Sequence, residues 1–172
     1  MTFQLRRVVT GHDANGKSVI DTDEVMSAVS RNAGAGVTGV DAWSTNQMPV
    51  DNSAAAAEAQ KKGYIDHSIP HMNYVDTGNG TVIRFIEWGP GNPPFTHRTA
   101  TVDYIIMVSG EIDLVVDGEK AVTLNAGDVL IQRGGMHTWL NKSNAPAVMA
   151  AILIDALPVT IGDKVMNTHF PK

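Results

Sequence analysis

The sequence predicts an all-β protein, an antiparallel sandwich or barrel that carries an N-terminal β extension and one short helix. Three observations lead to this class. Short runs rich in Val, Ile and Thr alternate with turn residues along most of the chain. From Thr81 onward, turn signals recur roughly every 8–12 residues, as they do in sandwiches and barrels. Only one segment has the composition of a stable helix.

The first elements are a predicted hairpin and a glycine-rich segment. Residues 3–9 form the first predicted strand, and the Asn15-Gly16 pair in the next turn is a strong two-residue hairpin signal. Val19 and Ile20 would begin the return strand. Residues 34–43 are rich in glycine and are compatible with either a loop or an irregular strand.

Residues 53–62 are the predicted helix. Ser53 can cap it, a run of alanines propagates it, and Gly63 lies where a helix would end. Glu58 and Lys62 are spaced i,i+4 and can pair. The helix carries no visible chemistry, so we expect it to pack outside a sheet or at a subunit contact.

The remaining chain reads as almost continuous strand. We expect one structural domain, in which residues 1–75 are an extension that packs on a barrel formed by residues 76–172. The predicted barrel strands are 81–88, 99–108, 111–116, 120–124, 128–132, 136–140 and 147–154.

Composition excludes several classes of function. The 172 residues include no cysteine, so disulfides, thiolate metal sites and cysteine nucleophiles are excluded. The net charge is −5 without a basic block, which argues against a nucleic-acid partner. The longest uncharged apolar stretch, 143–154, is shorter than the ~20 residues that cross a bilayer. With no signal-peptide pattern near the start, we expect a cytoplasmic protein without membrane partners.

Three short motifs are weak. Gly34, Gly36 and Gly39 spell G-x-G-x-x-G, but no βαβ pattern surrounds them, so a dinucleotide site is not expected. His67 and His71 have the spacing of a helical metal pair, yet Pro70 between them disfavours a helix, and their role stays open. The Arg133-Gly134-Gly135 triplet is a predicted turn.

The segment from Gly91 to Asn141 carries the candidate chemistry. His97, Thr99, Thr101 and Asp103 alternate, so a regular strand would point all four toward one face. An inward carboxylate is costly unless it is paired or bound to a metal. His137 lies on a later predicted strand and can face the same interior.

This segment resembles the cupin family. The first cupin motif, G-x5-H-x-H-x3–4-E-x6-G, is matched in spacing by Gly91, His97, Thr99, Asp103 and Gly110. The second motif is matched by Gly127, Gly134, His137 and Asn141, with 16 residues between the two motifs. Thr99 replaces the second histidine, Asp103 replaces the glutamate, and the second motif is one residue shorter around Gln132-Arg133. The resemblance implies a cupin-type antiparallel β-barrel.

The resemblance also implies a site. His97, Asp103 and His137 would be ligands of a divalent metal, Fe²⁺ or Zn²⁺, and Thr99, Trp139 and Arg133 would line the pocket. Two histidines and one carboxylate leave positions open for oxygen, water or substrate. In a metal-free barrel, Asp103 and His137 would be a hydrogen-bonded catalytic pair.

Three functions stay open at this point. The first is a metal-dependent oxygenase, isomerase or hydrolase acting on a small organic molecule, for example an aromatic or polyketide-like compound. The second is a metal-free dehydratase or cyclase that uses Asp103 and His137 as acid and base. The third is a non-catalytic module that binds a small molecule. Because small cupins are commonly dimers, the resemblance also implies a homodimer.

Overall fold

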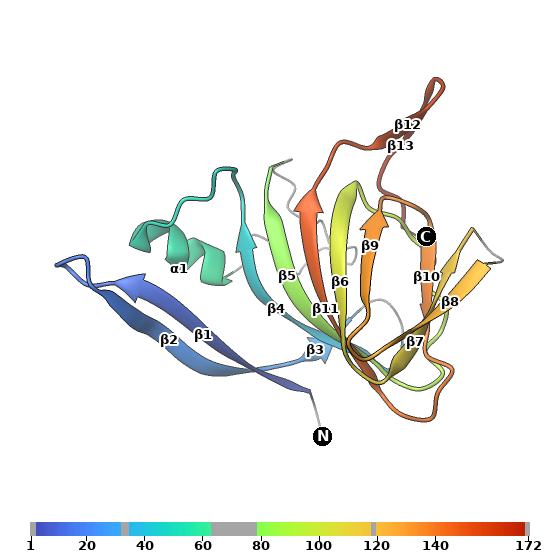
Figure 1. The fold of residues 1–172 in the computed structure, drawn as a ribbon, viewed down its shortest axis with the longest axis horizontal. Helices are drawn as coiled ribbons and strands as arrows, with labels where there is room; N and C mark the ends of the chain where they lie inside the picture. The colour runs from blue at the N-terminus through green and yellow to red at the C-terminus, as the bar shows by residue number, and fades with distance from the viewer. Residues whose placement is uncertain (1–2, 32–34, 63–78, 118–119, 171–172) are drawn as a thin grey trace.

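The computed structural model describes residues 3–31, 35–62, 79–117 and 120–170. In these residues strands are the main secondary structure and there is one helix, as predicted (Figure 1). The strands are β1 (Gln4–His12), β2 (Ser18–Ser27), β3 (Val29–Ser30), β4 (Val37–Thr45), β5 (Thr81–Trp88), β6 (Thr101–Ser109), β7 (Glu111–Val116), β8 (Lys120–Asn125), β9 (Val129–Arg133), β10 (His137–Leu140), β11 (Ala147–Asp155), β12 (Val159–Ile161) and β13 (Lys164–Met166), and the helix is α1 (Ala54–Lys62).

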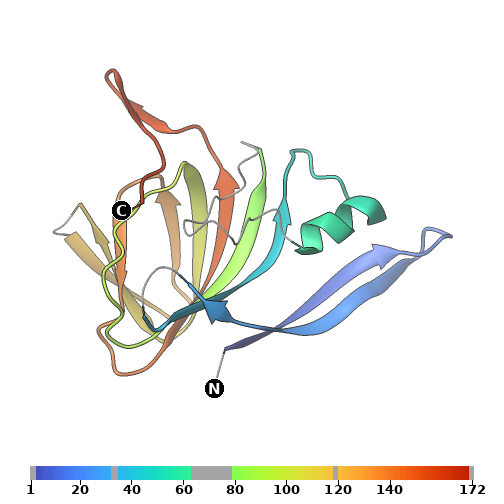
Figure 2. The same ribbon diagram turned by 180° about the vertical axis from the view of Figure 1, so that it is seen from behind.

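Two antiparallel sheets form the body of the molecule. The larger has six strands in the order β3-β4-β5-β11-β6-β9, and the smaller has three in the order β10-β7-β8. Figures 1 and 2 show them from opposite sides. The core lies between the sheets, because buried residues of both contribute to one apolar cluster. Trp88 of β5 and Trp139 of β10 meet there, with ring centroids 6.4 Å apart.

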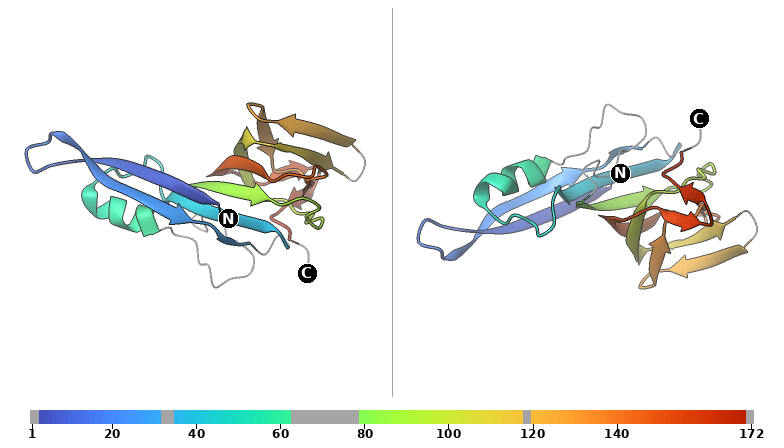
Figure 3. Two further views of the ribbon diagram at one scale, coloured as in Figure 1. Left: turned by 90° about the horizontal axis from the view of Figure 1, so that it is seen from below. Right: turned by 90° about the horizontal axis from the view of Figure 1, so that it is seen from above.

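The N-terminal hairpin is confirmed and extends away from the two sheets (Figure 3). Its turn forms around Asp13, whose carboxylate accepts hydrogen bonds from the backbone N–H groups of Asn15 and Lys17. Gly16 adopts a φ of 77°, which glycine tolerates best. Arg7 of β1 ties the hairpin to the body by donating to the carbonyl oxygens of Ala42, at 2.7 Å, and Lys61, at 3.1 Å.

The predicted helix is also confirmed. The hydroxyl of Ser53 accepts a hydrogen bond from the N–H of Ala56 at 3.2 Å, so it caps α1 as expected. The helix lies beside β4 at the edge of the molecule in Figure 1. Among the residues that the structure describes, no helix has the length and apolar composition needed to cross a membrane.

The glycine-rich segment 34–43 provides most of β4, so the six-stranded sheet takes two strands from before residue 76. Its glycines serve close packing. A Cβ atom on Gly39 would lie 2.8 Å from the carbonyl oxygen of Phe85 and 2.9 Å from Nε of Arg31. A Cβ atom on Gly89 would lie 2.9 Å from the carbonyl oxygen of Gly36. The G-x-G-x-x-G pattern thus reflects strand packing at its two described positions, Gly36 and Gly39.

Candidate functional site

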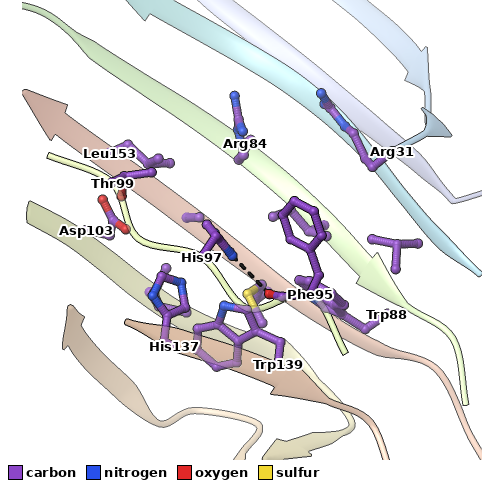
Figure 4. Close-up of a pocket in the computed structure, with 15 residues that line it drawn as sticks. Arg31, Arg84, Trp88, Phe95, His97, Thr99, Asp103, His137, Trp139 and Leu153 are labelled. Atoms are coloured by element: carbon purple, nitrogen blue, oxygen red, sulfur yellow. Dashed lines mark hydrogen bonds between the residues drawn. The ribbon is translucent and has the colours of Figure 1, made fainter. Parts of the chain in front are cut away.

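A cavity of about 60 Å³ lies between the two sheets. Five residues that the sequence analysis assigned to the site line it, and Figure 4 shows them together with two arginines and further aromatic rings. The five are His97, Thr99, Asp103, His137 and Trp139. The structure therefore places the predicted ligands and two of the three predicted pocket residues in the wall of one cavity.

His97 reaches the cavity by a different route from the one predicted. A regular strand from His97 to Asp103 would place both side chains on one face, but β6 begins only at Thr101. Instead, the backbone of His97 pairs with that of His137, with N–O distances of 3.0 and 2.9 Å. This pairing with β10 is what brings the two histidines together. The Thr99 and Thr101 hydroxyls hydrogen-bond to each other at 2.7 Å, so these buried side chains satisfy each other.

The two imidazoles are adjacent and uncharged at neutral pH. Their ring centroids lie 4.3 Å apart. Burial, followed by the neighbouring His137 ring, lowers the pKa of His97 to about 4. Burial also lowers the pKa of His137. Nδ1 of His97 lies 3.1 Å from the carbonyl oxygen of Phe95 and donates its proton there, so Nε2 carries the lone pair (Figure 4).

His137 has a partner at Nδ1 for either tautomer. This nitrogen lies 3.0 Å from the carbonyl oxygen of Gly135, which only accepts, and 3.1 Å from Nε2 of Gln132, which only donates. When Nδ1 donates to Gly135, Nε2 is an acceptor. When Nδ1 accepts from Gln132, Nε2 carries a proton. Nε2 of this ring can therefore take up or release a proton while Nδ1 keeps a hydrogen bond.

Asp103 is the titratable group best suited to chemistry near neutral pH. The residue is 6% exposed, and its Oδ1 atom is buried without a hydrogen-bond partner. Burial raises the pKa of this carboxyl group to about 6, although a hydrogen bond with Thr101 and the charge of Arg84 act in the opposite direction. A buried carboxyl group with an unsatisfied oxygen is costly, and such groups are found mainly where function requires them.

Sequence reasoning missed a buried charge cluster beside the cavity. Asp41 of β4 bonds Nη2 of Arg31 and Nε of Arg84, each at 3.0 Å, and all three side chains are at most 7% exposed. Both arginines line the cavity, and in Figure 4 they lie at the end away from His137 and Trp139. The signal in the sequence was a charged residue, Arg84, within the otherwise apolar start of the 81–88 strand.

Arg133 is not part of the cavity wall. It lines a separate surface pocket with Leu157, Val159 and Met166, because it lies at the end of β9 where the chain leaves the sheet. Trp88 and Phe95 line the cavity and were not predicted to do so. His67 and His71 lie outside the described residues.

The predicted metal ligands are of suitable chemical type, but they are not close enough together to coordinate one ion. Two neutral imidazoles and a carboxylate are chemically appropriate for Fe²⁺ or Zn²⁺. In the part of the chain that the structure describes, however, no three His, Asp or Glu side chains are close enough to hold one ion. Metal ligation by His97, Asp103 and His137 therefore stays a prediction.

Two antiparallel sheets around a cavity with paired histidines define a barrel of the class that the motifs predicted, and comparison with known proteins identifies the family. The Cupin domain family matches residues 82–154. Oryzines biosynthesis cluster protein J of Aspergillus oryzae is 31% identical over 159 residues, which are 92% of this chain and 87% of that protein. The chain belongs to the cupin family.

Two further similarities differ in kind. The cupin-domain-containing oxidoreductase virC of Hypocrea virens is 30% identical over 164 residues, covering 91% of this chain and 79% of that protein. A solved structure, described as a putative ethanolamine utilization protein from Salmonella typhimurium, has a TM-score of 0.49 and 13% identity. The match covers 90% of this chain and 98% of that one.

Proposed function

We propose that this cupin is an enzyme that transfers a proton on a small, largely apolar organic molecule. The observation that carries the proposal is Asp103, a buried carboxyl group with an unsatisfied oxygen and a pKa of about 6, in the wall of the same cavity as two neutral imidazoles. Relatives named as biosynthesis cluster proteins and oxidoreductases support a small-molecule substrate.

Asp103 and His137 have different roles in the proposed proton transfer. Ionised Asp103 takes a proton from a carbon next to a substrate carbonyl group, and the C–H electron pair moves into the carbonyl to give an enolate. His137, in the tautomer with a proton on Nε2, donates a hydrogen bond to the enolate oxygen. When Asp103 returns the proton to a different carbon of the enolate, the result is an isomerisation. When the enolate electron pair instead expels a hydroxyl group from the β-carbon and the proton held by Asp103 goes to that oxygen, water leaves and the result is a dehydration. Neither route needs an oxidant.

The apolar part of the wall sets the kind of molecule that fits. Trp88, Phe95 and Trp139 line the cavity, together with aliphatic side chains of β5 and β11. Aromatic rings recognise flat, apolar groups through stacking and exclude water from the reacting carbon. Aromatic and polyketide-like ketones are therefore the substrate classes to test first.

The test is proton exchange with heavy water. Purified protein, treated with a chelator, is incubated in D₂O with a panel of aromatic and short-chain 1,3-diketones and 3-oxo esters, and deuterium uptake is followed by NMR. We expect the wild type to accelerate exchange for at least one compound. Asp103→Asn should slow it by about 10²–10⁴-fold, the usual contribution of a general base.

Two controls make the result interpretable. Asp113→Asn changes a carboxylate that faces Lys142 and Thr123 outside the cavity, and it should leave exchange unchanged. Exchange that persists at the wild-type rate in Asp103→Asn would contradict the proposal. Binding of a panel compound without exchange would instead support the non-catalytic binding module.

A second candidate is a metal-dependent oxidoreductase, favoured by the adjacent imidazoles with Nδ1 held by backbone carbonyl groups. His97 and His137 would hold Fe²⁺ or Zn²⁺ through Nε2, and a third bond from Asp103 would require these side chains to move from the positions described here. A bound metal would supply Lewis-acid or redox chemistry. Elemental analysis of protein purified without chelator or metal-affinity resin tests this candidate. A stoichiometric metal that His137→Ala removes would support it, and a metal-free protein that is active in exchange would oppose it.

A further inference from the structure

The cavity is too small for the substrates proposed above. Its volume of about 60 Å³ compares with about 150 Å³ for a cavity that accepts benzene and roughly 300–1,000 Å³ for common ligand pockets. Part of the wall must therefore move before an aromatic molecule can reach Asp103. The question is which part moves at the lowest cost.

The ring of Phe170 covers the half-buried His97. The two rings are stacked, with centroids 5.7 Å apart and an angle of 15° between their planes. Phe95 joins them, at 4.9 Å from His97 and 6.3 Å from Phe170. Phe95 and His97 both line the cavity. Phe170 thus lies against the outer side of the cavity wall, although it comes from the far end of the chain.

The C-terminal segment 167–170 is held to this wall by hydrogen bonds with residues 98–100. Arg98 and His169 exchange two backbone hydrogen bonds of 3.0 and 2.9 Å. Arg98 Nε donates to the carbonyl oxygen of Asn167 at 2.7 Å, and the N–H of Ala100 donates to the hydroxyl of Thr168 at 3.0 Å.

This segment is anchored differently from the rest of the cavity wall. Asp103, His137 and Trp139 belong to strands of the two sheets and are fixed by strand pairing on β6 and β10. The C-terminal segment instead pairs with the irregular residues between Gly91 and β6 through an isolated bridge. Segments with few hydrogen bonds and little buried area open at lower cost than sheet strands.

We infer that residues 167–170 are a lid, in which Phe170 covers the outer face of His97 and holds this part of the cavity wall in place. A substrate enters when the lid leaves the Arg98–Ala100 segment, because the wall at Phe95 and His97 is then exposed and free to move. The inference concerns access and goes beyond the proposed reaction, so it stands whether the site transfers protons or binds a metal.

Chemical modification of His97 tests the lid without any substrate. Diethyl pyrocarbonate acylates neutral imidazole nitrogens, and peptide mass spectrometry gives a separate rate for each histidine. In the wild type we expect His97 to react at least tenfold more slowly than His12, which is exposed at the end of β1. Phe170→Ala should raise the His97 rate at least fivefold and leave the His12 rate unchanged.

Two further variants separate lid opening from general loosening. Thr168→Val removes the hydrogen bond to Ala100 but keeps the Phe170 ring, and it should also accelerate His97 modification. Phe85→Ala removes a half-buried ring on the face of β5 opposite the cavity, and it should not accelerate His97 modification. A His97 rate within twofold of wild type in both Phe170→Ala and Thr168→Val, with thermal unfolding showing folded proteins, would overturn the inference. Equal rates for His97 and His12 in the wild type would overturn it as well.

Discussion

Replacing Asp103 with asparagine should stabilise the fold at neutral pH and leave it unchanged in acid. The pKa of this carboxyl group rises from 3.8 in the unfolded chain to about 6 in the folded protein, chiefly through burial. The folded state therefore binds more protons than the unfolded state between these values, so stability is lost as the pH rises through about 6. The shift corresponds to about 3 kcal/mol at pH 7.

Asparagine has the shape of aspartate, can keep a hydrogen bond with Thr101, and carries no charge to desolvate. Urea unfolding of chelator-treated wild type and Asp103→Asn at pH 3.5, 5 and 7 measures the effect. The variant should gain about 3 kcal/mol over the wild type between pH 3.5 and 7, or about 6–12 °C in melting temperature for a chain of this size. A difference that does not change with pH would refute a buried, unpaired carboxyl group.

Three other outcomes follow from the same structure. His97→Gln should change the pH dependence of stability in the opposite direction. Folding lowers the pKa of this histidine from 6.5 to about 4, so its contribution to stability is present above pH 6.5 and is lost as the pH falls toward 4. In urea unfolding the wild type should gain about 3 kcal/mol over the variant between pH 4 and 6.5. Gly39→Ala should lower stability by about 1–3 kcal/mol in the same assay, because its Cβ would lie 2.8 Å from the carbonyl oxygen of Phe85, whereas Gly135→Ala, whose nearest contact is 3.7 Å, should change it little. Light scattering should give a homodimer, since apolar side chains such as Ile20 and Val25 on the projecting hairpin are more than 60% exposed, and a monomer at micromolar concentration would contradict this.

Features with a local cause could be predicted from the sequence. The hairpin at Asn15-Gly16 and the Ser53 cap depend on residues a few positions apart, and both form. The hairpin connection spans residues 13–17, however, and is longer than the predicted two residues. The 81–88 strand has the predicted bounds because Gly80 and Gly89 flank a run of β-formers. The motif spacing also predicted that His97 and His137 share a cavity, because that spacing reflects a strand arrangement found throughout the family.

Features that depend on distant parts of the chain could not be predicted. The Arg31–Asp41–Arg84 cluster forms because β4 pairs with β5, a strand more than 35 residues later in the sequence. No local sequence pattern predicts that pairing. Phe170 reaches His97 because the C-terminal segment folds back on Arg98. Arg133 was assigned to the pocket from its place beside His137 in the sequence, but the turn at Gly134, with a φ of 64°, separates the two side chains.

The pH dependence of substrate deuterium exchange in metal-free protein tests the central claim most directly. Ionised Asp103 is the proposed base, so the exchange rate should rise with pH, pass its half-maximal value near pH 6 and then level off. The Asp103→Asn variant should lack this rise. A rate that is flat across pH 6, or exchange that appears only after Fe²⁺ or Zn²⁺ is added, would contradict Asp103 as the proton-transfer group.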